Sequence, residues 1–140
     1  MAVQGFRNMI RLFIGILGCF YSFFSYLIMK YNYSDQKTII VCDRYFYQFF
    51  FDLFGRHGEK IVSIFPKPDI TFFLDGELSS LSKRMNDIFD SKVDKNYYID
   101  VIKYYRTLAK KYNFVVLDAL SDKEDINKKI LIYLKVNIYG

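Results

Sequence analysis

Cysteine, histidine, proline and glycine are all scarce in this chain of 140 residues. The two cysteines, Cys19 and Cys42, stand inside apolar runs, where a free thiol behaves as a small buried hydrophobe, and His57 is the single histidine. No Cys/His cluster has the spacing of a metal site, so the composition predicts a reducing, cytoplasmic compartment. With seven glycines and two prolines the chain is neither disordered nor of low complexity.

Aromatic and basic residues are plentiful by contrast. The chain has 15 Phe and 13 Tyr, and its net charge is +5 from 20 basic and 15 acidic residues. An excess of cations suits an anionic ligand such as a phosphate, although it is also common in chains that bind nothing charged. The length is that of one domain with a substantial core, and residues 1–140 are therefore expected to form a single domain.

Residues 12–29 carry no charge and lie between Arg7 and Arg11 on one side and Lys30 on the other. This is about the length of a membrane span. Small residues recur in it every three or four positions and would let a neighbouring helix approach closely, in lipid or in a soluble core. They are Gly15, Gly18, Ser22 and Ser25. We expect a long buried helix packed on a sheet, with a membrane span as the alternative.

An apolar run at residues 38–42 leads directly into Asp43 and Arg44. A short continuous run of this kind is typical of a buried parallel strand whose two faces are covered by helices. Ligands of open α/β sheets bind at the carboxyl ends of the strands, where Asp43 and Arg44 would lie. A purely structural ion pair at the strand end is the alternative.

The aromatic segment 46–54 is expected to be a helix on which Gln48 and Asp52, four residues apart, share one face. Residues 55–58 then break this helix. His57 lies in that break between glycines and charged residues, and we expect it to be a solvated loop residue rather than a catalytic base.

Two further apolar runs end in an acid, as the first does. Residues 70–75 end in Asp75 and residues 114–118 end in Asp118. Three strands, each followed by a helix, predict an α/β fold with a three-layer arrangement of a parallel sheet and flanking helices.

Helices and one loop are expected between and after these strands. A helix begins at Glu77 and continues to Arg84, and residues 85–96 lack periodicity and predict a mobile loop. From residue 97 apolar positions recur at helical spacing until Asn113 closes the helix, and its cations are expected to form a solvated face. A final helix through Leu134 would be capped by Asp122 or Ser121. The cations of the solvated face are Lys103, Arg106, Lys110 and Lys111.

Three blocks of sequence, in this order, resemble the thymidylate kinase family of nucleoside monophosphate kinases, which have the P-loop kinase fold. The resemblance extends from residue 38 to about residue 134. The blocks are Val41-Cys42-Asp43-Arg44-Tyr45, then Pro68-Asp69-Ile70-Thr71-Phe72-Phe73-Leu74-Asp75 with Ser82-Lys83-Arg84, then Tyr104-Tyr105-Arg106-Thr107-Leu108-Ala109 with Val116-Leu117-Asp118-Ala119.

This resemblance implies a role for each matching residue. Asp43 would be catalytic, beside a Mg²⁺ ion and the reacting phosphates, and the acceptor monophosphate would be bound by Arg44, Tyr45 and Gln48. Arg84 would be a catalytic and ATP-binding residue that begins a lid over residues 85–96. The adenine of ATP would be bordered by Asp118, Ala119 and Leu120. ATP and Mg²⁺ are thus the cofactors implied, with a nucleoside monophosphate as acceptor.

The 140 residues depart from the family pattern at the donor site. They contain no Gly-x-x-x-x-Gly-Lys-Ser/Thr phosphate loop, which cradles the donor phosphates. We therefore expect a partial kinase-like domain that lacks the first strand and the phosphate loop and is inactive alone, so enzyme activity stays undecided. The alternatives are a non-catalytic nucleotide-binding or scaffold remnant and a protein anchored in a membrane by residues 12–29. No nucleic-acid partner is expected, and a homodimer is left open.

Overall fold

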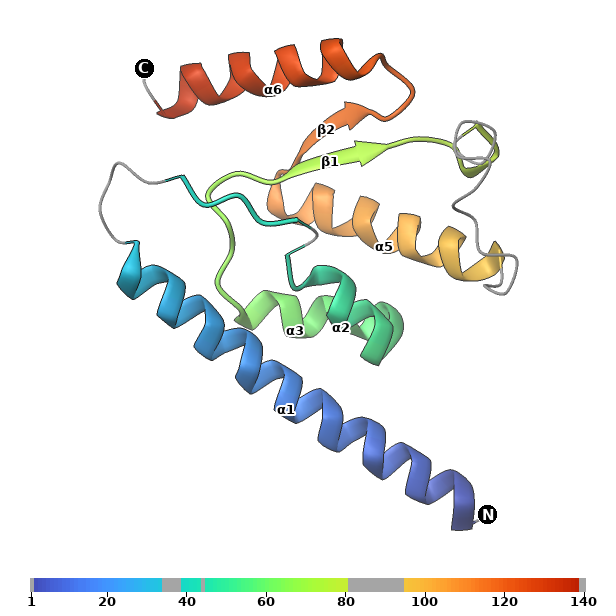
Figure 1. Ribbon diagram of the computed structural model, residues 1–140. Coiled ribbons are helices and arrows are strands. Elements are labelled where there is room, and N and C mark those ends of the chain that lie inside the picture. The colour runs from blue at the N-terminus through green and yellow to red at the C-terminus, as the bar shows by residue number, and fades with distance from the viewer. Residues whose placement is uncertain (1, 34–38, 44, 81–94, 139–140) are drawn as a thin grey trace. The chain divides into compact units, whose positions relative to one another are not determined.

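The structure is a computed structural model, and it describes residues 2–33, 39–43, 45–80 and 95–138 (Figure 1). The described residues are mostly helical and divide into two compact units, unit 1 (Met1–Lys67) and unit 2 (Pro68–Gly140). Unit 1 contains α1 (Ala2–Asn32), α2 (Tyr47–Phe54), the 3-10 helix η1 (Gly55–His57) and α3 (Gly58–Ile64). Unit 2 contains β1 (Phe72–Asp75), α5 (Lys95–Tyr112), β2 (Val115–Asp118) and α6 (Lys123–Ile138).

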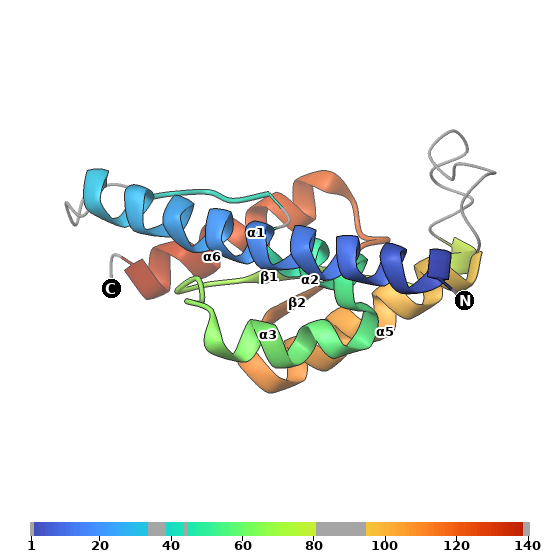
Figure 2. The ribbon, with the colours of Figure 1, turned by 90° about the horizontal axis from the view of Figure 1, so that it is seen from below.

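One continuous helix, α1, forms the first part of unit 1 and passes alongside α2 (Figures 1 and 2). A side chain added at Gly15 would meet the ring of Phe54 at 2.7 Å, and one added at Gly18 would collide with the ring of Phe49. Ser22, further along the same face, is buried. The small residues of α1 therefore let the aromatic residues of α2 approach its backbone, as the spacing predicted.

The rest of α1 is exposed. Leu12–Asn32 is long and apolar enough to cross a membrane by length and composition, and 11% of it is buried. Large apolar side chains such as Phe13, Leu17 and Phe20 are more than half exposed. The expectation of a helix buried throughout was wrong, because Gly15 and Ser22 are the only buried residues among the described side chains of α1 and most of its large apolar side chains are exposed.

The core of unit 1 is aromatic. Phe50 of α2 is fully buried, and its ring lies 4.8 Å from that of Phe65, which also makes edge contacts with Phe46 and Phe23. The helix α2 begins one residue later than expected and ends at Gly55, whose φ of 57° no residue with a side chain adopts easily. His57 is exposed, as the sequence predicted.

The first predicted strand does not form. Residues 39–43 have no strand conformation, and Ile39, Ile40 and Val41 are 50%, 44% and 87% exposed. A strand is stabilised by hydrogen bonds to a neighbouring strand, and the part of unit 1 that the structure describes contains none. Cys42 is therefore exposed rather than buried, while Cys19 is half-buried in α1.

The sheet belongs to unit 2, and the described residues give it two strands instead of the three expected. β1 and β2 pair in parallel with Phe72 opposite Val115 and Asp75 opposite Asp118. Successive side chains of a strand point to opposite faces. Accordingly Phe72 contacts Tyr133 of α6 at a ring distance of 5.6 Å, whereas Phe73 stacks on Tyr105 of α5 at 5.7 Å.

The two helices α5 and α6 thus cover opposite faces of the sheet, which gives unit 2 the three layers that were expected (Figure 1). Leu108 of α5 is fully buried, and the other buried apolar residues of this unit lie near it in sequence. They are Tyr104, Ala109, Phe114 and Leu117.

Single residues determine where α5 ends and where α6 begins. Asn113 adopts a φ of 54° and ends α5, as predicted, because asparagine tolerates the left-handed region. The carboxylate of Asp122 accepts a hydrogen bond from the amide of Lys123 at 2.8 Å, so Asp122 caps α6. That helix continues to Ile138, four residues beyond the expected end.

Candidate functional site

Two carboxylates end the paired strands of unit 2 at the same edge of the sheet. Asp75 and Asp118 are partners in the parallel register, so the two residues lie side by side where β1 and β2 end. The carboxyl ends of parallel strands are where α/β proteins bind ligands. We refer to Asp75, Asp118 and the turn that follows Asp118 as the carboxyl edge.

A cation from α5 reaches the carboxyl edge. The Nε–H group of Arg106 donates to both carboxylate oxygens of Asp75, at 3.0 Å each. This hydrogen bond raises the pKa of Arg106, and the guanidinium is a permanent charge there. Arg106 is exposed, as expected for the solvated face of α5, but it also binds an acid 31 residues away in sequence, which the sequence did not predict. In the sequence, the only sign of this contact is that residue 106 is an arginine on a helix whose other cations are lysines.

Hydrogen bonds fix the turn after β2, residues 118–120. The amide of Ala119 donates to the backbone oxygen of Asp75 at 2.8 Å, which extends the strand pairing by one residue. The amide of Leu120 donates to Oδ1 of Asp118 at 2.8 Å, and the hydroxyl of Ser121 lies 3.4 Å from Oδ2. The structure thus brings Asp118, Ala119 and Leu120 together in one ordered turn with Leu120 exposed.

The predicted acceptor residues lie in unit 1. Asp43 is exposed in a bend, and Arg44 lies outside the described residues. Tyr45 has a φ of 35°, a conformation that costs a bulky residue about 1 to 2 kcal/mol. Its hydroxyl donates to the backbone oxygen of Pro66 at 3.0 Å, and burial raises the pKa of Tyr45 above the usual tyrosine range. The phenol is therefore neutral at physiological pH.

Gln48 and Asp52 share a face of α2, as their spacing predicted. The Nε2 group of Gln48 donates to Oδ1 of Asp52 at 2.9 Å.

The predicted lid lies mostly outside the described residues. Residues 78–80 are helical, as expected for the start of the helix from Glu77, whereas Arg84 and residues 85–94 are not described. Lys95 and Asn96, which were expected to belong to the loop, instead form the first turn of α5. The role of Arg84 stays a prediction.

No cluster of three or more metal-ligating side chains exists among residues 2–33, 39–43, 45–80 and 95–138. Mg²⁺ in phosphotransfer sites is commonly held by one or two carboxylates together with the substrate phosphates. Asp43 supplies one exposed carboxylate, which has the right donor chemistry for such an ion.

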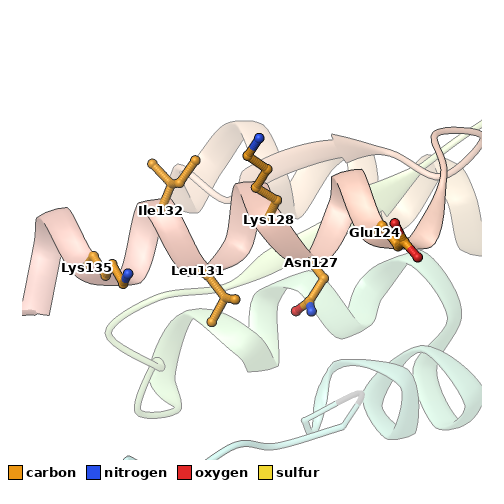
Figure 3. Close-up of a pocket in the computed structure, with 6 residues that line it drawn as sticks. All are labelled: Glu124, Asn127, Lys128, Leu131, Ile132 and Lys135. Atoms are coloured by element: carbon orange, nitrogen blue, oxygen red, sulfur yellow. The ribbon is translucent and has the colours of Figure 1, made fainter.

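A cavity of about 380 Å³ runs along α6, and none of its lining residues is a predicted site residue. Figure 3 shows Lys128 and Ile132 on one side of the helix and Asn127 and Leu131 on the other, so these side chains do not converge on a ligand. Because all its lining residues come from one helix, we do not assign this cavity as the functional site. The lining residues are Glu124, Asn127, Lys128, Leu131, Ile132 and Lys135.

Comparison with curated proteins places these features in context. The chain is 37% identical over 108 residues to a protein named probable thymidylate kinase of Sulfurisphaera tokodaii, a match that covers 72% of this chain and 57% of that protein. It is 30% identical over 110 residues to probable thymidylate kinase 1 of Saccharolobus solfataricus, covering 74% and 58% of the two chains. A probable thymidylate kinase of Methanocaldococcus jannaschii is 34% identical over 108 residues, with 71% and 56% covered.

The parallel α/β unit with acids at its carboxyl edge thus lies in a sequence that is similar to proteins named as nucleotide kinases. More specifically, the chain is thymidylate kinase-like, which confirms the resemblance seen in its three sequence blocks. It spans less than two thirds of the length of these curated relatives. No family model matches the chain, and no solved structure matches it significantly.

Proposed function

We propose that this chain is the acceptor-binding part of a cytoplasmic phosphotransferase with a P-loop kinase-like fold, which transfers phosphate from ATP to a nucleoside monophosphate resembling dTMP. The observation that carries the proposal is the carboxyl edge of β1 and β2, where Asp75 and Asp118 end in register in a chain whose relatives are named thymidylate kinases. Phosphoryl transfer requires mainly positioning and charge stabilisation, and an edge of this kind is where both are usually supplied.

The acceptor phosphate would be held by Arg44, whose planar guanidinium can form two parallel hydrogen bonds with phosphate oxygens. The neutral phenol of Tyr45 and the amide of Gln48 would contact the rest of the nucleotide. Asp43 would hold Mg²⁺, which supplies charge neutralisation for the phosphates when bound. Arg84 would contribute a further cation to the reacting phosphates.

The fit to ATP is partial. The turn at residues 118–120 offers an ordered edge for adenine, with its backbone amides fixed by Asp75 and Asp118. The 140 residues contain no phosphate loop, so the chain has no dedicated cradle for the donor triphosphate. We expect this chain alone to bind nucleotides without catalysing phosphoryl transfer.

Calorimetric titration of the chain with dTMP is expected to show binding, and Arg44→Lys is expected to weaken it about tenfold. Lysine keeps the charge but loses the planar fork, and one charge-assisted hydrogen bond is worth about 1.5 kcal/mol or more. Arg56→Lys, the same substitution at an exposed residue of η1, is the matched control and should leave the affinity unchanged.

Titrations with dTMP, other nucleoside monophosphates and ATP together distinguish a nucleotide-binding kinase-like domain from a scaffold protein that binds no nucleotide. Heat with dTMP that Arg44→Lys does not reduce would contradict the role of Arg44. The absence of heat with every nucleotide would overturn the proposed function and favour a scaffold protein.

Attachment to a membrane is a second candidate function, which the exposure of α1 favours. The stretch Leu12–Asn32 is 11% buried, and residues 1–33 contain no acidic residue but three cations, Arg7, Arg11 and Lys30. An apolar helix with basic flanks suits a bilayer with anionic head groups.

Carbonate extraction of cells that produce the chain tests this candidate. If α1 inserts in lipid, the chain is expected to stay in the membrane pellet at alkaline pH. Replacing the exposed Phe13, Leu17 and Phe20 by serine should then release it to the supernatant. Recovery of the unaltered chain entirely in the supernatant would exclude the membrane candidate without affecting the nucleotide proposal.

A further inference from the structure

We propose that Arg106 is a positioning residue, which acts through Asp75 to hold the turn at residues 118–120 in the conformation that binds the adenine ring of a nucleotide. This inference rests on the proposed function, because it needs the turn to be an adenine-binding element. It concerns a residue of α5 that would itself touch neither the base nor the phosphates.

The first step is the contact between helix and strand. The Nε–H of Arg106 donates to both oxygens of Asp75 at 3.0 Å, and the side chains of the two residues are 47% and 25% exposed. Among the described residues Asp75 is the only hydrogen-bonding partner of this guanidinium. The bond is made by the Nε–H group, and methionine has no donor there, so Arg106→Met removes the bond.

The second step leads from the strand to the turn. The backbone oxygen of Asp75 accepts the amide hydrogen of Ala119 at 2.8 Å. One residue, Asp75, is thus bound to Arg106 through its side chain and to Ala119 through its main chain. Fixing the side chain restricts the backbone dihedral angles of Asp75 and hence the direction of its carbonyl group.

The third step explains why loss of Arg106 should affect the turn at residues 118–120 and not the rest of the sheet. The other end of the strand pair is held independently, by the amide of Val115, which donates to Thr71 at 2.8 Å. The stacking of Phe73 on Tyr105 keeps α5 against the same face of the sheet without Arg106. Loss of Arg106 should therefore loosen the turn and leave the β1–β2 pairing in place.

Amide hydrogen exchange measured by NMR tests the positioning role directly. In Arg106→Met, which has no donor at this place, the amide of Ala119 is expected to exchange about two- to fivefold faster, the scale of one exposed ion pair, while that of Val115 is unchanged. Asp75→Ala, which removes the acceptor, should do the same. The matched control is Lys110→Met, which removes an exposed charge from the same helix without touching Asp75, and it should alter neither amide.

Calorimetry with ATP then connects the turn to binding. Arg106→Met is expected to weaken ATP binding about two- to fivefold and to leave dTMP binding unchanged, whereas Lys110→Met changes neither. A purely structural role would lower the two affinities together, and that result would overturn the inference. Unchanged exchange of Ala119 in Arg106→Met would overturn it as well.

Failure of the proposed function gives a different result. In that case the unaltered chain produces no heat with any nucleotide, although Ala119 still exchanges faster in Arg106→Met. If the unaltered chain binds nucleotides and Arg106→Met binds ATP equally well, the positioning role is wrong and the proposed function stands.

Discussion

Replacement of Gly58 by alanine is expected to lower the free energy of unfolding by about 2 to 3 kcal/mol. Gly58 is the first residue of α3 and is buried. A Cβ atom there would lie 2.6 Å from the backbone oxygen of Phe50 and 2.8 Å from its carbonyl carbon. These are main-chain atoms of the neighbouring α2, so a side-chain rotation cannot relieve the overlap and the two helices must move apart.

Urea unfolding followed by circular dichroism measures this effect. The matched control is Gly5→Ala in α1, where nothing lies within 4 Å of the added Cβ atom. Alanine is the better helix former by about 1 kcal/mol, so Gly5→Ala should be neutral or stabilising. Equal unfolding midpoints for the two variants would show that α2 and α3 do not approach as closely as described.

Replacement of Leu108 by alanine is expected to lower the free energy of unfolding by about 3 kcal/mol, the usual penalty for a cavity at a fully buried leucine. Leu108 has no exposed surface and lies on the face of α5 that carries the buried Tyr104. Thermal unfolding of the chain, followed by the near-ultraviolet signal of its tyrosines, provides the measurement.

Leu74→Ala serves as the control for this substitution. Leu74 lies in β1 of the same unit but is 50% exposed, so the same change of side chain should cost less than about 1 kcal/mol. If Leu108→Ala and Leu74→Ala lowered the free energy of unfolding equally, Leu108 would not be the centre of the core of unit 2.

The helices α1, α2, α5 and α6 could be predicted from local pattern, whereas α3 was not predicted. The uncharged stretch 12–29 forms the middle of α1, and its small residues face α2 as their spacing predicted. Asn113 ends α5, and Asp122 caps α6. Helix formation and capping depend on residues within about four positions of each other, which a single sequence displays directly.

The strand predicted at residues 38–42 shows the opposite case. Its apolar run is as pronounced as those of β1 and β2, yet residues 39–43 lie exposed and unpaired among the residues described in unit 1. A strand requires hydrogen bonds to a neighbour that the local sequence does not specify. The runs at β1 and β2 form strands because each supplies the partner of the other.

The candidate site likewise has features that the sequence predicts and features that only folding brings together. The sequence by itself determined that the chain is thymidylate kinase-like, that acids follow its apolar runs and where α1, α2, α5 and α6 lie, because these depend on residue types and short spacings. Only the tertiary structure decided that Asp75 lies beside Asp118, that α1 is largely exposed and that Arg106 binds Asp75. The physical reason is distance along the chain: Arg106 and Asp75 are 31 residues apart, and no local propensity favours a contact that only folding brings about.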